Sequence, residues 1–217
     1  MISRGFVYVA TGTGYLEEAR ISAESLRRHH PDIPICLVTD RPLDIRAPFD
    51  HVIQRGDVEH KPIDKLLAWH CPFDRAVFLD TDTRVGGDLT TLFDVVEHFD
   101  LAALQDVNRG WDYPLDGVPE CFTEFNTGVI AFRRTPKVAQ FFASWRAGYD
   151  ALQVKQGHLN RQSDQPAFRQ ALYHSDLRIA PLPSEFHFIA NFPNATLWKV
   201  RLLHGRGDLD RIAEQVD

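Results

Sequence analysis

The sequence of 217 residues contains few cysteines and no pair of them at a metal-binding spacing. Its three cysteines, Cys36, Cys71 and Cys121, lie far apart, and no C-x-x-C pair occurs. Disulfide frameworks need an even set of cysteines, and zinc–thiolate sites need closely spaced pairs. We therefore exclude a zinc–thiolate site and expect a protein that works in a reducing compartment.

A long apolar run is also missing from the N-terminal region. The first apolar stretch, Phe6–Ala10, has only five residues. A signal peptide needs an apolar core of about 7–15 residues, and a membrane-spanning helix needs about 20. The sequence therefore predicts a cytoplasmic protein without an integral membrane segment.

The chain lacks an excess of positive charge. It carries 24 basic and 30 acidic side chains, which give a formal net charge of −6. Surfaces that bind nucleic acid broadly are basic, so we do not expect a nucleic-acid partner. An acidic protein that binds a phosphate-rich ligand needs a metal ion or a local cluster of donors to offset the repulsion.

The composition and the order of patterns predict an α/β fold. Hydrophobic residues make up 44% of the chain and charged residues 25%, which is typical of a globular protein. A strand pattern at Phe6–Ala10 is followed by helical spacing from Leu16 to Leu26 and by a second strand pattern at Ile35–Thr39. This order predicts parallel pairing. We expect one domain over residues 1–217, with a mostly parallel, Rossmann-like central sheet flanked by helices.

The rest of the chain continues this alternation. We expect further strands, all in the same sheet, at His51–Gln54, Arg75–Asp80, Leu101–Leu104, Asn126–Phe132, and near Ile179 and Leu202. We expect helices that start at Pro62 and Pro136, a helix over Leu92–Phe99 capped by Asp88, and a helix over Asp164–Tyr173 capped by Ser163. Residues 106–124 contain Asn, Gly, Pro and Asp and predict a long functional loop.

Two aspartates one residue apart end the apolar run Val77–Leu79. Open α/β sheets bind ligands at the carboxyl ends of their strands. If the extended geometry continues past the strand, Asp80 and Asp82 point to the same side. Two carboxylates there suit a hard divalent cation that shares its shell with water and substrate phosphates. The alternative is a polar turn or a helix cap without a ligand.

A loop with two glycines, Thr11–Gly14, follows the first strand and precedes a helix. This is the context of the dinucleotide fingerprint G-x-G-x-x-G, but Glu17 stands where the third glycine belongs. Glu17 and Glu18 also place negative charge where a pyrophosphate would bind, so NAD binding is not expected. The loop can instead present backbone groups to a nucleotide base, and Tyr15 can stack on that base or serve packing alone.

One alternative function comes from the stretch Asp80–Val85. It resembles in part the motif of haloacid-dehalogenase-type phosphatases, in which the first aspartate attacks phosphorus. Those enzymes usually carry the motif near the N-terminus and need a later Gly-Asp-x-x-x-Asp. In the run from Gly207 to Asp210 the second acid comes too early, and Ile212 stands where it belongs. We retain a phosphatase as the alternative.

A resemblance over nearly the whole chain is to nucleotide-sugar glycosyltransferases of the GT-A fold, especially family 8 and related retaining enzymes. Motifs similar to theirs occur in the same order: the loop ending in Tyr15, then Lys65, Pro72–Thr83 with Asp-x-Asp, Phe125–Phe132 with Asn-Thr-Gly, Ser163–Phe168 with Asp-Gln, and Leu203–Gly207 with His-Gly-Arg-Gly. Each motif is weak alone. Their order over most of the chain makes the resemblance specific.

The resemblance implies a metal-dependent glycosyltransferase that uses a nucleotide diphosphate sugar, expected to be UDP-linked. Asp80, Asp82 and His204 would hold Mn²⁺ or Mg²⁺, and one imidazole among oxygen ligands favours Mn²⁺. His204 as a plain structural residue is the alternative. Further donor-binding candidates are Thr11, Tyr15, Thr81 and Gly207, with Lys65 and Arg206 adding positive charge at the diphosphate.

The resemblance also implies roles at the transferred sugar. Asn126, Asp164 and Gln165 would hydrogen-bond its hydroxyls, and their alternatives are turn and capping roles. Asp164 and Gln165 are the catalytic candidates. Retention needs a carboxylate nucleophile or a front-face route, and in the second route the Gln165 carbonyl would stabilise the positive charge that develops on the sugar.

The acceptor is not specified by these motifs. We expect Trp111 and Tyr113, in the loop 106–124, to form its platform. No basic, aromatic tail follows His204, which argues against a lipid-linked acceptor. A nucleotide-sugar-binding protein that lacks turnover is a further alternative.

Overall fold

The computed structural model describes residues 3–41, 47–106, 115–156, 163–190, 195–209 and 211–212. Its helical elements are α1 (Thr13–His29), the 3₁₀ helix η1 (Pro62–His70), α2 (Thr91–His98), α3 (Pro136–Gln156), α4 (Gln165–Tyr173) and the 3₁₀ helix η3 (Ser184–Phe186). Its strands are β1 (Arg4–Ala10), β2 (Ile35–Thr39), β3 (His51–Gln54), β4 (Arg75–Leu79), β5 (Thr83–Val85), β6 (Leu101–Gln105), β7 (Phe125–Arg133), β8 (Ile179–Leu182), β9 (Phe188–Ile189) and β10 (Leu202–His204).

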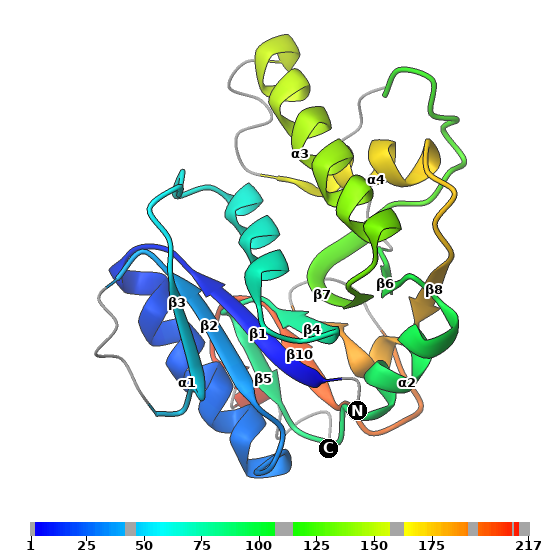
Figure 1. Ribbon diagram of the computed structural model, residues 1–217. Coiled ribbons are helices and arrows are strands. Elements are labelled where there is room, and N and C mark those ends of the chain that lie inside the picture. Colours follow the sequence, from blue (N-terminus) through cyan, green and yellow to red (C-terminus); the bar gives the residue numbers. More distant parts are fainter. Residues whose placement is uncertain are drawn as a thin grey trace.

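A seven-stranded sheet in the order β3-β2-β1-β4-β7-β6-β8 forms the centre of the protein (Figure 1). Strands β1 to β4 pair in parallel, as the strand–helix–strand order predicted. β7 is antiparallel to both β4 and β6, and β8 returns parallel to β6. The mostly parallel sheet expected from the sequence is confirmed.

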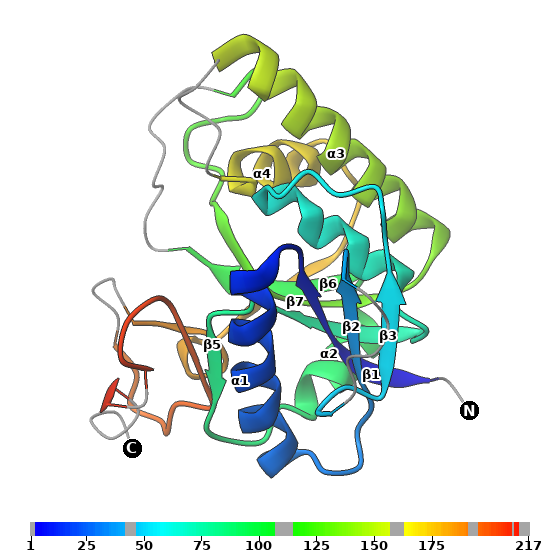
Figure 2. The ribbon, with the colours of Figure 1, turned by 90° about the vertical axis from the view of Figure 1, so that its left-hand side faces the viewer.

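Helices cover both faces of this sheet (Figure 2). Because side chains alternate along a strand, Phe6 and Tyr8 of β1 lie in one apolar cluster and Val7 lies in the other. The first cluster includes residues of α1 and α2, and the second includes residues of η1, α3 and α4. The carboxyl ends of β1 and β4 therefore open onto an edge that lies between two helical layers.

A second, three-stranded sheet in the order β5-β10-β9 corrects one expectation. The strand near Leu202 does not finish the central sheet. It pairs antiparallel with β5, with Leu202 opposite Val85 and His204 opposite Thr83. β5 and β9 have only three and two residues, which is too short to give a periodic signal. The small sheet brings the C-terminal part of the chain beside the turn that follows β4.

Hydrogen bonds to α1 hold β5 in place. The hydroxyls of Ser22 and Thr83 lie 2.6 Å apart, and the backbone N–H of Val85 donates to Ser25 Oγ at 2.9 Å. The Tyr8 hydroxyl completes this buried chain of polar groups at 3.0 Å from Ser22 Oγ. The turn between β4 and β5 is therefore fixed at both ends by packed elements.

Two helix starts differ from the expectation. Asp88 does not cap α2, whose N-cap is Thr90. The Asp88 carboxylate instead accepts hydrogen bonds from the backbone N–H and the hydroxyl of Thr90, both at 2.9 Å. These bonds close a turn that precedes the first residue of the helix. Asp164 takes the N-cap position of α4, and Ser163 Oγ accepts from the Gln165 N–H at 3.3 Å.

The loop expected over residues 106–124 is described only in part. Residues 115–124 carry neither helix nor strand. Trp111 and Tyr113, the expected acceptor platform, lie outside the described residues. Among the helices of the described chain, none combines the length and the apolar composition needed to cross a bilayer.

Trp145 of α3 gives a stability prediction. Its side chain is 1% exposed, its ring contacts Phe168 at 4.8 Å between centroids, and its indole N–H donates to the Asp164 carbonyl at 3.0 Å. Trp145→Ala is expected to lower the free energy of unfolding by about 3–5 kcal/mol. The matched control is Trp198→Ala, because Trp198 is 73% exposed, and its effect is expected within about 0.5 kcal/mol. Urea unfolding followed by circular dichroism measures both, and equal losses would contradict the assignment.

Candidate functional site

The site is organised by the turn that joins β4 to β5. β4 ends at Leu79, and Asp80, Thr81 and Asp82 occupy the turn. The backbone N–H of Asp80 donates to the Gly128 carbonyl of β7 at 2.8 Å, and Thr83 Oγ1 donates to the Asp80 carbonyl at 2.9 Å. In the sheet, β4 lies between β1, which is parallel to it, and β7, which is antiparallel to it. The two aspartates follow β4 at this junction.

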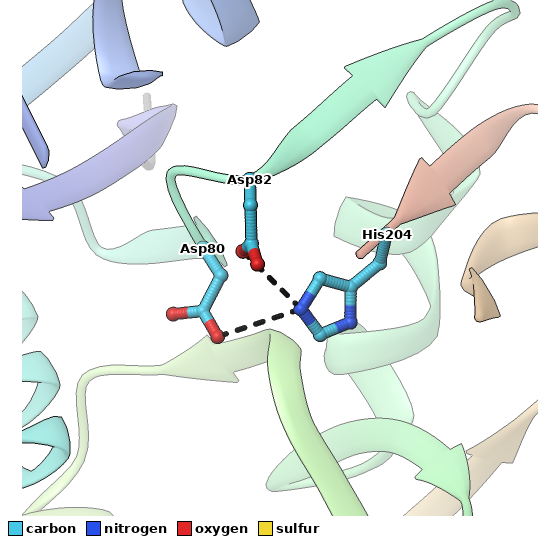
Figure 3. A group of neighbouring side chains, drawn as sticks. All are labelled: Asp80, Asp82 and His204. Atoms are coloured by element: carbon cyan, nitrogen blue, oxygen red, sulfur yellow. Dashed lines mark ion pairs between the residues drawn. The ribbon is translucent and has the colours of Figure 1, made fainter. Parts of the chain in front are cut away.

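Asp80, Asp82 and His204 converge on one point (Figure 3). Each offers a ligand atom, and these atoms all lie within 4.8 Å of one another. His204 Nε2 is 3.4 Å from Asp82 Oδ1 and 3.8 Å from Asp80 Oδ2. The aspartates come together through a turn and not through strand alternation, so the expected convergence holds for a different geometric reason. Two oxygens and one nitrogen at this spacing can hold a divalent cation.

The environment shifts the two carboxyl groups in opposite directions. Burial raises the pKa of Asp80, although the charges of Lys65 and His204 oppose this. Burial also acts on Asp82, but the hydrogen bond and charge of His204 and the charge of Arg206 outweigh it and lower the pKa. A cation bound between the two carboxylates would favour the charged form of each and relieve the repulsion between them.

Lys65 of η1 links the aspartate turn to α4. Its side chain is 9% exposed, and its Nζ lies 3.5 Å from Asp80 Oδ2 and 3.2 Å from Asp164 Oδ1. Nζ also donates to the Thr127 hydroxyl at 3.0 Å. Burial alone would lower the pKa of Lys65, but the charges of Asp164 and Asp80 outweigh it and raise the pKa. The lysine is therefore a fixed positive charge between two carboxylates.

Two buried acids that the sequence reasoning missed orient the sugar-binding candidates. Asp106 Oδ2 accepts from Asn126 Nδ2 at 3.1 Å and from Gln165 Nε2 at 3.2 Å. Glu124 Oε1 accepts from Gln165 Nε2 at 3.1 Å. Asp106 follows β6 as Asp80 follows β4, so the same strand-end signal was present there. The assignment of residues 106–124 as one loop concealed it.

Asp164 has one paired and one unpaired oxygen. The residue is 3% exposed, and while Oδ1 faces Lys65, Oδ2 is buried and has no hydrogen-bond partner within the described part of the chain. A buried polar atom without a partner is costly. Asp164 Oδ2 therefore has unused capacity as a hydrogen-bond acceptor.

A cavity of about 200 Å³ lies beside the aspartate turn. It is lined by predicted site residues, namely Thr11, Tyr15, Lys65, Asp80, Thr81, Asp82 and Arg206. It is also lined by residues that the sequence reasoning missed, namely Val9, His60, Lys61, Pro62 and Asp64. The predicted residues Asn126, Asp164, Gln165, His204 and Gly207 do not line this cavity. Asp164 is connected to the cavity through Lys65, and Asn126 and Gln165 share the acceptor Asp106.

Asp64 lines the same cavity as Tyr15. Its carboxylate accepts from Thr11 Oγ1 and from the backbone N–H groups of Glu59 and His60, each at 2.9 Å. His60 has a φ of 55°, which is strained for a residue with a side chain. The Thr11 hydroxyl is thus engaged within the protein, which leaves its backbone for a ligand.

Glu18 joins the turn to the C-terminal segment. It accepts from Thr81 Oγ1 at 2.9 Å and pairs with Arg206. The Arg206 guanidinium also lies 3.8 Å from Asp82 Oδ2 and 5.7 Å from the centre of the Tyr15 ring. The sequence reasoning treated Glu18 only as a charge that opposes phosphate, and its role as a tie was missed.

The phosphatase alternative needs a later acid beside the aspartate turn, and Asp208, the described acid of the run from Gly207 to Asp210, does not belong to the metal cluster. Among the described residues, Asp80, Asp82 and His204 form the one cluster of acids and histidines that could hold a metal. Asp208 is exposed and accepts a hydrogen bond from the Arg211 N–H at 3.1 Å. Asp210 lies outside the described residues.

Comparison with solved structures identifies the fold. The chain is similar to the glycosyltransferase GlyE of Streptococcus pneumoniae TIGR4 (TM-score 0.66, 16% identity, 95% of this chain and 56% of that chain). It is also similar to the galactosyltransferase LgtC in complex with donor and acceptor sugar analogs (TM-score 0.60, 17% identity, 94% and 87%). Mouse xyloside xylosyltransferase 1 gives a TM-score of 0.56 at 15% identity, with 94% and 98% covered.

These likenesses concern the fold, because all the identities are low. The chain has the GT-A fold of these glycosyltransferases, as the sequence resemblance to family 8 predicted. The chain spans 56% of the length of GlyE. No protein-family model and no curated protein matches the sequence.

Gly128 gives a prediction about the ring of His204. A Cβ atom at Gly128 would lie 2.4 Å from His204 Cε1, so Gly128→Ala must displace the imidazole. We expect a loss of about 1–3 kcal/mol of unfolding free energy and loss of any rise in melting temperature that Mn²⁺ produces. The control is Gly148→Ala within α3, where the atoms nearest to the new Cβ belong to α4 and lie at 3.7 Å, so stability should rise by up to about 1 kcal/mol. Thermal unfolding with and without Mn²⁺ tests both, and an unchanged Mn²⁺ response in Gly128→Ala would contradict the prediction.

Proposed function

We propose that this protein is a metal-dependent glycosyltransferase that moves a sugar from a UDP-linked donor to an acceptor with retention of configuration. One observation carries the proposal. Asp80, Asp82 and His204 converge within 4.8 Å beside a cavity lined by Tyr15 and Lys65. This convergence lies at the edge of the sheet where α/β proteins bind ligands.

The three converging side chains suit a divalent cation. Carboxylate oxygens are ligands of Mg²⁺ and Mn²⁺, and an imidazole nitrogen among them favours Mn²⁺. Gly128 supports this assignment, because its missing Cβ leaves the space that the His204 ring fills. When bound, the cation supplies Lewis-acid stabilisation of the leaving diphosphate.

The residues around the cavity suit the nucleotide. Tyr15 is 47% exposed at the cavity and offers a ring for stacking on a base. Thr11 and Gly207 offer backbone groups. Lys65 and Arg206 each face a carboxylate, Asp80 and Asp82 respectively. In the proposal these two cations turn toward the diphosphate, where their charge is worth more than in solvent.

Gln165 suits the developing charge on the sugar. Its side-chain nitrogen donates to Asp106 and Glu124, so its carbonyl oxygen is directed away from those acids. In the proposed front-face route, the bond from the anomeric carbon to the diphosphate breaks while the Gln165 carbonyl faces the positive carbon. The acceptor oxygen then bonds on the same face, and its proton goes to the leaving phosphate. Asp164 Oδ2 accepts a hydrogen bond from a sugar hydroxyl and fixes its orientation.

Binding of UDP with Mn²⁺ is the first test. Ligand at 100 times its Kd is expected to stabilise the protein by about 2.7 kcal/mol, measured as a rise in melting temperature. Asp82→Asn should abolish this rise, because it removes one charged ligand of the cation. Asp88→Asn is the control, since that carboxylate is 54% exposed and pairs with Thr90. Hydrolysis of phosphate esters without UDP affinity would support the phosphatase instead.

Turnover and stereochemistry are the second test. A screen of UDP-sugars with Mn²⁺ is expected to release UDP, and NMR of the product should show the anomeric configuration of the donor. Gln165→Ala should lower kcat by roughly 10²–10³-fold with little change in UDP affinity, whereas Gln170→Ala on the same helix should not. An inverted product would rule out the front-face route. UDP binding without sugar release from any donor would leave a binding protein.

A further inference from the structure

His187 is a buried histidine that contacts the candidate ligand His204. It is 0% exposed, its Nε2 lies 2.8 Å from His204 Nδ1, and the ring centroids are 4.9 Å apart. His187 lies between η3 and β9, and β9 pairs with β10 so that Ile189 stands opposite His204. The backbone of the small sheet thus holds the two imidazoles side by side.

The chemistry of imidazole gives this contact a direction. A neutral ring has one N–H and one nitrogen with a free lone pair, and a metal needs the lone pair. His204 Nε2 is the nitrogen that faces Asp80 and Asp82. For Nε2 to bind a cation, the hydrogen must sit on Nδ1, and an acceptor must receive it. His187 Nε2 is the atom at hydrogen-bond distance from Nδ1.

The other nitrogen of His187 shows that the ring is not there for its own packing. His187 Nδ1 is buried without a hydrogen-bond partner within the described residues. A buried polar atom without a partner is destabilising, and an apolar side chain between Phe186 and Phe188 would avoid the cost. Within the described chain, the hydrogen bond that the His187 side chain makes is the one to His204, so the cost is retained for that contact.

We propose that His187 is a positioning residue of the cation site. It accepts the His204 Nδ1 hydrogen, fixes the tautomer in which Nε2 carries the lone pair, and aims that lone pair between Asp80 and Asp82. Gly128 lies against the face of the same ring. The His204 ring is therefore restrained at its edge by His187 and at its face by Gly128. This inference rests on the proposed function, because it assumes that the cluster holds a cation.

The test compares two substitutions of similar size. His187→Gln keeps a carbonyl oxygen that can accept from His204 Nδ1, whereas His187→Met offers no strong acceptor. Mn²⁺ is titrated into each protein with UDP present, and free Mn²⁺ is counted by electron paramagnetic resonance against a UDP blank. We expect His187→Met to weaken Mn²⁺ binding by roughly 10–100-fold and His187→Gln to stay within a few-fold of the natural protein. Thermal unfolding without metal checks that each variant is folded.

His30→Met is the matched control. His30 is also buried, and it is not part of the cluster. Its Nε2 accepts from the Leu89 N–H at 3.1 Å. It should lose stability but not Mn²⁺ affinity. Equal Mn²⁺ affinity of His187→Met and the natural protein would overturn the inference, as would equal weakening by Met and Gln. If the natural protein takes up no Mn²⁺ beyond the blank, the cation site itself is absent, and the proposed function fails with it.

Discussion

The concentration of negative charge at the end of β4 is the constraint on which the rest of the site depends. Asp80, Asp82 and Asp164 lie 3.2 to 3.8 Å from Lys65, His204 and Arg206. Charges that are partly removed from water are stable only when each has a close partner. Lys65 and Arg206 each have an acid as a partner, so these charges are balanced within the protein.

The geometry of this charge cluster comes from two sheets that meet at one turn. The central sheet delivers Asp80 through β4, and the small sheet delivers His204 through β10. The backbone N–H of Gly205 donates to the Asp82 carbonyl at 3.0 Å, which ties the two ends of the site directly. α4 brings Asp164 and Gln165 to the other side, and the buried Trp145 holds the start of that helix through the Asp164 carbonyl. Packing on both faces of the sheet thus fixes the polar groups between them.

Local patterns predicted most of the central sheet, because strand and helix periodicity is written within a few neighbouring residues. The bounds of β2 and β3 and the start of α3 followed from such patterns. The small sheet did not, since β5 and β9 are too short to show a period and form only through contacts between distant segments. The Asp88 cap was wrong because the Asp88 carboxylate accepts from the backbone N–H and the hydroxyl of Thr90 instead. His187, Glu124 and Asp64 were missed because each bonds to a site residue 17 or more positions away in the sequence.

The pairing of β10 with β5 has a thermodynamic consequence. A cation held by Asp80, Asp82 and His204 would act as a reversible cross-link between segments that the unfolded chain keeps far apart. The unfolded chain has no such site, so occupancy and native structure would be coupled equilibria, and each would favour the other. The stability of the small sheet would then depend on the supply of metal and nucleotide.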